Sequence, residues 1–327
     1  MHAQENPTGR PQTSLPTWTP VRRILCPVDF SSCSRAAVLH AVALARPSGA
    51  EIIGLFVLPF VFPRGGEGSG FSGLEPVAPK ADVTSAATAR LAEFLRPTRD
   101  AGLTTHGFVK SGDCVEHILE QAHGLQADLI VMGTHGRAAV ERAVLGSVTA
   151  RVLRKSLCPV LTVSKAGARR RLAPAAPLSR IVCAVDVAEG AASTLSYALS
   201  LAHSTGATLT VLHVIKGVRV LKARAHRAAE LRRELEAAAI AHGEPGTSVK
   251  TLVVGGDPYE AIVRVVSTRR AGLIVIGSAR GRRSIASRVI RESALPVVTV
   301  PSLARVGASG WLPQKSTERG SLARESA

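Results

Sequence analysis

The strongest constraint in this sequence is an internal repeat. The heptapeptide RILCPVD at 23–29 recurs as RIVCAVD at 180–186, an offset of 157 residues. Further matches join 109–113 to 253–257 and 129–133 to 273–277 at an offset of 144, and 151–160 to 288–297 at an offset of 137. Because each copy is as long as an ordinary domain, the 327 residues are predicted to form two related domains.

Within each copy, short apolar runs alternate with segments of helical spacing. In the first copy we expect strands at 24–29, 51–58, 105–110, 129–132 and 159–163, and helices near 34–46, 83–102 and 114–125 and after Gly146. Ser31 or Ser34 is the candidate cap of the first helix, which Pro47 ends. Unalternating apolar strands between helices indicate a parallel sheet covered on both faces. The predicted fold class is α/β, with two doubly wound, Rossmann-like domains of five parallel strands each.

The domain boundaries follow from the repeat and from changes in composition. We expect a disordered arm at 1–20, a first domain at 21–165, a linker at 166–177, a second domain at 178–301 and a disordered tail at 302–327. The Gly-rich segment 59–79 is predicted to be a mobile loop beside the first domain's site.

The charge of the chain is strongly basic but unevenly distributed. The formal net charge is +17, and clustered basic side chains favour a nucleic-acid partner because they release counterions from a polyphosphate. Residues 1–165 hold 17 basic and 13 acidic residues, whereas residues 166–327 hold 24 and 11. Aromatic residues, which stack on bases in single strands, make up only 3%. Nucleic acid is therefore a disfavoured partner, and a nucleotide-independent interaction or nucleic-acid-binding module in the basic second half stays open as an alternative.

The cysteines and the apolar runs indicate in which cellular compartment the protein is expected. Five scattered cysteines fit neither a disulfide framework nor a metal site. Residues 1–20 lack the apolar core of a secretory signal, and no run of about 18 apolar residues predicts a membrane span. We therefore expect a cytoplasmic protein with no membrane partner. Cys33, near a helix start, leaves a lowered thiol pKa open, although a buried filler is the favoured interpretation.

One segment at the carboxyl end of a predicted strand carries two groups of backbone donors. Gly133 and Gly136 allow N–H groups to approach an anion closely, and Gly146 and Ser147 open a helix whose N-terminal dipole favours phosphate. In an open parallel sheet, ligands bind beyond the carboxyl ends of the strands, where the strand order reverses. The segment therefore predicts a phosphate-containing ligand.

The same glycines carry a family resemblance. The pattern G-x2-G-x9-G-S is similar to the ATP-binding motif of universal stress proteins, and the strands at 26–29 and 158–161 resemble that family's first and last strands. The resemblance covers 21–164 and 178–301, as a tandem form. It implies ATP or another adenine nucleotide, with or without Mg²⁺, and a role in stress response through nucleotide-dependent sensing or signalling. At most, slow ATP hydrolysis accompanies this role.

The resemblance also assigns residues to the nucleotide. It implies that Pro27, Val28 and Asp29 lie beside the adenine, that Val57 contacts it and that Met132 walls the nucleotide. Asp29 can accept a hydrogen bond from an exocyclic amine. A carboxylate that only stabilises the following helix is the alternative for Asp29.

The ribose and phosphates have their own implied set, which is Gly133, Gly136, Gly146, Ser147, Val148 and Thr149. The hydroxyls of Ser147 and Thr149 can donate to phosphate oxygens. Arg137 is a candidate charged contact, with a solvated arginine as the equal alternative.

The second copy departs from this pattern. Seven residues are missing after 277, and the counterpart of Gly146 is Arg283. A weaker second site is expected from the residues that remain, which are Val185, Asp186, Val214, Gly277 and Ser284. The arginines at 280, 282 and 283 leave another anion open, although a solvated turn is favoured.

Enzyme chemistry finds little support. No Walker A sequence and no carboxylate pair for Mg²⁺ appear, so we expect no catalytic residue and no protein-bound metal. A ligase or adenylyl transferase of similar fold needs paired glycines after the first strand, and DFSSCS at 29–34 lacks them. The resemblance implies pairing of the last strands, Val160–Val163 with Val297–Val300, as an intramolecular pseudo-dimer, and it leaves a homodimer open.

Overall fold

The computed structural model confirms the α/β fold class. It describes residues 20–59, 80–135, 145–169, 178–186, 191–215, 221–243, 245–278 and 284–302. The expected arm, the 59–79 loop and the tail fall almost entirely outside these ranges.

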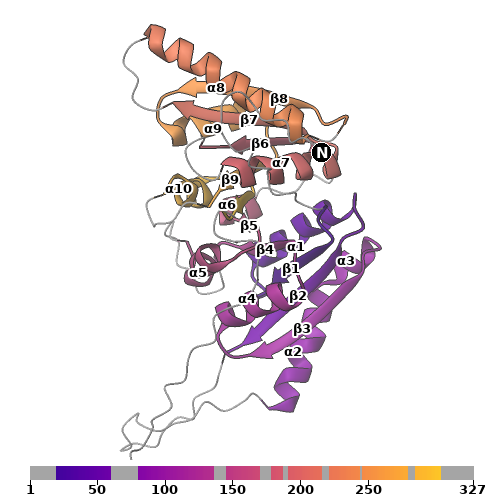
Figure 1. The fold of residues 1–327 in the computed structure, drawn as a ribbon. Coiled ribbons are helices and arrows are strands. Elements are labelled where there is room, and N and C mark those ends of the chain that lie inside the picture. Colours follow the sequence, from indigo (N-terminus) through magenta and orange to yellow (C-terminus); the bar gives the residue numbers. More distant parts are fainter. Residues whose placement is uncertain are drawn as a thin grey trace, which may run out of the picture.

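Both copies repeat one succession of elements (Figure 1). The first contains β1 (Arg23–Pro27), α1 (Ser32–Ala45), β2 (Glu51–Leu58), α2 (Ala81–Phe94), α3 (Arg96–Asp100), β3 (Thr105–Ser111), α4 (Cys114–Gly124), β4 (Leu129–Gly133), α5 (Ser147–Lys155) and β5 (Val160–Val163). After α6 (Lys165–Arg169), the second contains β6 (Arg180–Ala184), α7 (Ala191–Thr205), β7 (Thr208–Ile215), α8 (Leu221–His242), β8 (Val249–Gly255), α9 (Pro258–Thr268), β9 (Leu273–Gly277), α10 (Ile285–Glu292) and β10 (Val297–Val300).

The described strands form one continuous sheet in the order β3-β2-β1-β4-β5-β10-β9-β6-β7-β8. Neighbouring strands within each half are parallel, and the two halves meet where β5 pairs antiparallel with β10. Two buried hydroxyls cross this seam in a symmetric way: Thr162 donates to the Val297 carbonyl and Thr299 to the Val160 carbonyl, both at 3.2 Å. The last strands therefore pair as the resemblance implies.

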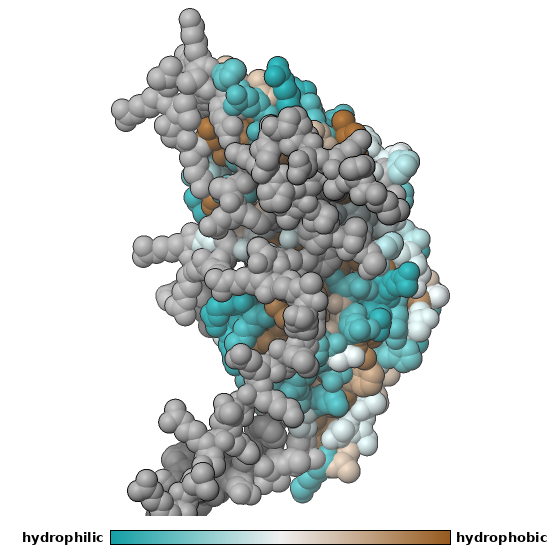
Figure 2. Space-filling view, viewed as in Figure 1, coloured by the Kyte–Doolittle hydropathy of each residue, from teal (hydrophilic) through white to brown (hydrophobic). Residues whose placement is uncertain are grey.

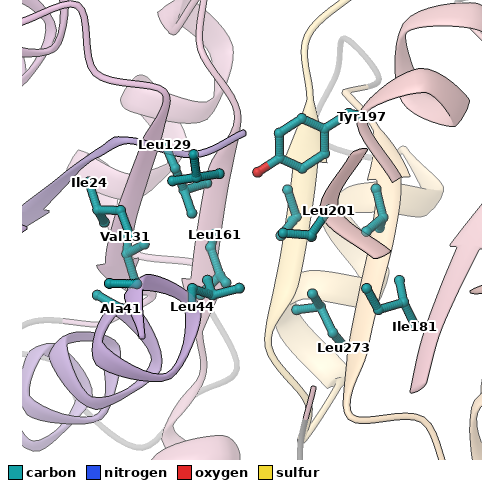
Figure 3. Close-up of a cluster of buried hydrophobic side chains, with 14 of the residues drawn as sticks. Ile24, Ala41, Leu44, Leu129, Val131, Leu161, Ile181, Tyr197, Leu201 and Leu273 are labelled. Carbon is teal, nitrogen blue, oxygen red and sulfur yellow. The ribbon is translucent and has the colours of Figure 1, made fainter. Parts of the chain in front are cut away.

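The apolar core is divided by the sheet. One cluster runs through both halves on a single face, where α1 and α7 cover the strands, and it includes Leu161, Tyr197 and Leu201 (Figure 3). The opposite face holds two separate clusters, one under α4 and α5 and the other under α9 and α10. The continuous cluster ties the two copies together, because it buries apolar area that neither copy covers alone.

Two segments differ from the sequence expectation. The single helix expected near 83–102 is broken at Leu95 into α2 and α3, because Pro97 has no N–H for a continuous helix and its ring clashes with the preceding turn. The first four residues of the linker expected at 166–177 are helical and belong to α6, and residues 170–177 lie outside the described residues. This helix packs on α1, and Ser164 anchors its start by donating to the Ser293 carbonyl at 2.8 Å and accepting from the Gly167 N–H at 3.1 Å.

Hydrophilic residues and smaller apolar areas alternate over the described surface in the view of Figure 2. Of the helices that the structure describes, none combines the length and apolarity needed to cross a bilayer.

Candidate functional site

A cavity of about 350 Å³ lies at the carboxyl ends of β1, β2 and β4 in the first half. This is where the strand order reverses, since β1 leads outward to β2 and β4 lies on its other side. Its volume falls within the range of small-molecule sites. Its lining consists of Pro27, Val28, Asp29, Ser34, Leu55, Val57, Cys114, Ile118, Met132, Gly133, His135, Gly146, Ser147, Val148 and Thr149.

Most residues predicted for the nucleotide line this cavity. Three come from the end of β1 and the loop after it, which are Pro27, Val28 and Asp29, and Val57 comes from β2. The others come from the end of β4 and the start of α5, which are Met132, Gly133, Gly146, Ser147, Val148 and Thr149. Gly136 and Arg137 lie outside the described residues.

The N-terminus of α5 presents backbone donors to the cavity. The first bond within the helix runs from the Ala150 N–H to the Gly146 carbonyl at 2.9 Å, so the N–H groups of residues 147–149 precede the ladder. The N-cap residue is Gly146, and among the described residues no side chain caps this end. The donors and the positive end of the helix dipole are thus directed at whatever the cavity holds.

Gly133 and Gly146 must both be glycines, because other atoms of the chain lie where a Cβ would be. A Cβ at Gly146 would lie 2.8 Å from the Thr134 carbonyl oxygen, which accepts the Gly146 N–H at 2.8 Å. A Cβ at Gly133 would lie 2.7 Å from the Cys33 Cβ and 3.0 Å from its carbonyl carbon. Backbone atoms cannot move aside as a flexible side chain can, so no larger residue fits either position without displacing the cavity wall.

The role expected for the Thr149 hydroxyl needs correction. Thr149 is buried, and its hydroxyl donates to the Gly133 carbonyl at 2.9 Å. Its single hydrogen is therefore used to hold α5 against the end of β4 and is not directed at a phosphate. The exposed Ser147 hydroxyl and the three backbone N–H groups remain the donors at this end.

The loop after β1 is held from two sides. The Val28 N–H donates to the Leu55 carbonyl at 2.8 Å, and the Asp29 Oδ1 accepts from the Ser31 N–H at 3.0 Å. Ser31, not Ser34, caps α1 by accepting from the Ser34 N–H. Phe30 adopts a left-handed conformation with φ 61° and packs between the Phe56 and Phe94 rings, with centroid distances of 4.6 and 5.4 Å. The half-buried Asp29 carboxylate is fixed at the cavity wall.

Five cavity residues lie outside the set that the family resemblance assigns to the nucleotide, namely Ser34, Leu55, Cys114, Ile118 and His135. Cys114 directly follows the carboxyl end of β3, so the rule that places ligands at that edge could have found it. Burial, with Asp113 and Asp29 nearby, raises the pKa of the Cys114 thiol to about 11. The His135 ring is buried, and its Nδ1 lies 2.7 Å from the Thr134 hydroxyl.

The other four cysteines are buried. Burial, followed by the charge of Asp29, raises the pKa of the Cys33 thiol, so the alternative of a lowered pKa is wrong. Burial raises the thiol pKa of Cys26 to about 12 and that of Cys183 further. The described residues contain no cluster of three or more His, Cys, Asp or Glu side chains that could hold a metal ion.

The second half keeps the strand-side geometry but not the helix terminus. The Val185 N–H donates to the Leu212 carbonyl at 2.9 Å, as Val28 does to Leu55, and Asp186, Val214 and Gly277 stand at the corresponding strand ends. Ser284, however, caps α10 by accepting from the Ser287 N–H at 3.1 Å. The N-terminus of α10 is therefore capped by the side chain of Ser284, whereas the backbone N–H groups at the N-terminus of α5 are left to the cavity. The arginines at 280, 282 and 283 lie outside the described residues.

A second contrast lies beside each helix. Arg151 of α5 contacts Asp113, the cap of α4, with 3.3 Å between nitrogen and oxygen. The equivalent Arg288 instead stacks 3.8 Å above the Tyr259 ring centroid and contacts Glu292 at 3.3 Å. The two copies have thus diverged around the site more than in the sheet.

Comparison with known proteins agrees with the repeat. The model of the universal stress protein family matches residues 20–164 and 177–301. A universal stress protein of Methanocaldococcus jannaschii is 33% identical over 148 residues, covering 44% of this chain and 82% of that protein. One from Thermus aquaticus is 33% identical over 142 residues, covering 43% and 98%. The crystal structure of a universal stress protein from Archaeoglobus fulgidus has the same fold, with a TM-score of 0.64, 22% identity and coverage of 88% and 98%.

Proposed function

Because the chain belongs to the universal stress protein family, we propose that it binds ATP or another adenine nucleotide in the first-half cavity and acts in stress response by nucleotide-dependent sensing or signalling. The observation that carries the proposal is the uncapped N-terminus of α5, whose donors face a cavity lined by the predicted adenine and phosphate residues. We place this function in the cytoplasm.

The two ends of the cavity suit the two ends of a nucleotide. Val28, Val57, Ile118 and Met132 offer apolar surface for a base, and Asp29 offers an acceptor for its exocyclic amine. At the other end, the N–H groups of residues 147–149 suit phosphate oxygens. Mg²⁺ enters the proposal only as the counter-ion that accompanies ATP.

The chemistry supports binding better than turnover. Strong ATP hydrolysis needs a positioned base for the attacking water and cations around the transferred phosphoryl group. Asp29, a carboxylate at the cavity wall, is oriented by the Ser31 N–H at the base end instead. We therefore propose at most slow hydrolysis, with occupancy of the site as the signal.

The duplication gives this site an internal partner. We propose that the chain acts as an intramolecular pseudo-dimer, with β5 and β10 at its seam and a functional nucleotide site in the first half. The second-half residues Val185, Asp186, Val214, Gly277 and Ser284 are then a weak or unused site, since Ser284 already satisfies a donor of α10.

A matched pair of variants tests the proposal. Ser147→Asp and Ser284→Asp place the same carboxylate at equivalent helix starts, where acidic residues favour the helix. In calorimetric titration with ATP, we expect Ser147→Asp to weaken binding at least a hundredfold and Ser284→Asp to leave it unchanged. Equal effects of the two variants, or no ATP binding by the unmodified protein, would refute the assignment.

A further inference from the structure

A second hollow lies far from the nucleotide cavity, at the outer edge of the second half. It has a volume of about 740 Å³, and its lining comes mainly from α8 and the edge strand β8. Figure 1 shows α8 and β8 at the end of the molecule away from the first half. Its lining is Arg232, Glu236, Ala239, Ile240, Gly243, Thr247, Val249, Lys250, Thr251, Leu252 and Arg269. We call it the α8–β8 groove. Because β8 ends the order of strands, the backbone along one of its sides has no neighbouring strand among the described residues.

The corresponding place in the first half is packed. There, the break between α2 and α3 drives Leu95 onto the sheet, where it is 1% exposed. A Cβ at Gly54 would lie 2.5 Å from Leu95 Cδ1, and one at Gly107 would lie 3.7 Å from the same atom. In the second half the repeat places Val211 and Thr251 at the two glycine positions, and α8 runs through without a break. The groove exists because this packing has no second-half equivalent.

The charge of the groove has diverged in the same way. In the first half, the edge-strand residue His106 contacts Glu51, with 3.1 Å between Nε2 and the carboxylate oxygen. The repeat replaces His106 by Lys250 and Glu51 by Thr208, so a basic residue is kept and the carboxylate beside it is lost. Glu236 is already paired with Arg232 at 2.8 Å. Among the residues that the structure describes, neither Lys250 nor Arg269 forms an ion pair.

The rim of the groove is also apolar in part. Ile240 is 82% exposed on α8, an unusual exposure for a large aliphatic side chain on a helix that otherwise covers the sheet. Ala239 and Leu252 lie in the lining near the basic groups. A ligand that fits this surface combines carboxylates with apolar side chains and offers its own backbone to a free strand edge.

We propose that the α8–β8 groove binds an acidic, extended peptide segment of a partner protein by strand addition to β8. Main-chain hydrogen bonds to the strand edge supply affinity, and alternate side chains supply specificity, as in other cases of β-augmentation. Carboxylates of the peptide pair with Lys250 and Arg269, and apolar side chains between them contact Ile240 and Ala239. This site is separate from the nucleotide cavity and does not depend on the proposed function.

The test uses the full chain and a fluorescein-labelled peptide of alternating Glu and Val, measured by anisotropy in low-salt buffer. We expect Lys250→Glu and Arg269→Glu each to weaken binding at least tenfold. Lys110→Glu, which makes the same charge change on the other edge strand β3, is the matched control and should change binding less than twofold. All three side chains are exposed, so the substitutions leave the core untouched.

Hydrogen exchange adds a readout for the strand edge. Peptide binding is expected to slow amide exchange within 249–255 and leave exchange within 105–111 unchanged. The proposal is overturned if a Lys–Val peptide binds equally well, if the Glu–Val peptide does not bind, or if exchange within 249–255 is unaffected. Binding of duplex DNA that Lys250→Glu abolishes, without binding of the Glu–Val peptide, would also overturn it and would assign the groove to nucleic acid instead.

Discussion

The buried imidazole of His40 gives a sharp prediction about stability and pH. His40 lies on α1, which covers the face of the sheet that holds the continuous apolar cluster, and its side chain is 3% exposed. Its Nδ1 has no hydrogen-bond partner among the described residues. Burial lowers the pKa of this imidazole from 6.5 to about 4. The neutral form is therefore favoured in the folded protein, whereas the unfolded chain takes up a proton at the ordinary pKa.

The magnitude follows from proton linkage. Above pH 6.5 the folded and unfolded chains both hold neutral His40, and the full stability is present. As the pH falls, the unfolded chain binds the proton first, so stability is lost until the pH passes the folded pKa of about 4. With about 1.4 kcal/mol for each pKa unit, the loss from this residue is roughly 3 kcal/mol in full and about 2 kcal/mol at pH 5.

Urea unfolding followed by circular dichroism at pH 7 and pH 5 measures this loss. We expect His40→Leu to reduce the fall in unfolding free energy between the two values by about 2 kcal/mol relative to the unmodified protein. Tyr197→Phe, at the equivalent position of α7, is the control and should not alter the pH dependence, since burial raises the pKa of that phenol. An identical pH dependence in His40→Leu and the unmodified protein would show that the linkage reasoning is wrong.

Three further predictions concern the site and its supports. Gly146→Ala is expected to abolish ATP binding and lower the melting temperature, because its Cβ would lie 2.8 Å from the Thr134 carbonyl oxygen; Gly124→Ala, with nothing within 4 Å, is the calorimetric control and should bind normally. Cys114 is the one cysteine of the five that is not buried, so N-ethylmaleimide should label it before the other four, although its raised pKa makes the reaction slow at neutral pH. Saturating ATP should suppress this label, and mass spectrometry would contradict the prediction if ATP left labelling unchanged or if other thiols were labelled first. Asp113→Ala and Asp257→Ala each remove a helix cap and should each lower the urea-unfolding free energy by about 1 kcal/mol, and a loss confined to one of them would contradict the equivalence of the copies.

Much of the fold could be predicted because the sequence pattern of most strands occurs twice, once in each copy. The run at 51–58 was predicted with the bounds that β2 has, and the last strands were predicted as the pairing elements that β5 and β10 prove to be. These strands are mainly apolar, and most of their residues are buried, which makes their pattern strong. The predicted parallel halves follow from the same property.

The rest depended on contacts that local patterns do not encode. The break at Leu95 follows from Pro97 but also from the packing of Leu95 over Gly54, which lies far away in the sequence. The helix α6 is short, and its composition resembles that of a linker. It is held in place by the contact of Ser164 with Ser293 of the other copy, which a local pattern cannot predict.

For the site, the glycine motif located the cavity, whereas the side chains that complete it come from other elements. Ile118 comes from α4. The position of α4 relative to the glycine motif depends on the order of the strands in the sheet, which the sequence does not give directly. The sequence assigned the Thr149 hydroxyl to phosphate. Its partner is the Gly133 carbonyl, which becomes adjacent only when α5 packs against β4, so the sequence alone could not reveal this bond.

The most direct measurement of the central claim is the identity and amount of nucleotide bound to the purified protein. The full chain would be denatured and the released small molecules quantified by liquid chromatography and mass spectrometry, after saturation with ATP and removal of the excess. The cavity in the first half predicts one adenine nucleotide for each chain, and less than a tenth of that amount for Ser147→Asp. No retained nucleotide together with no calorimetric binding, or equal retention by Ser147→Asp, would contradict the account.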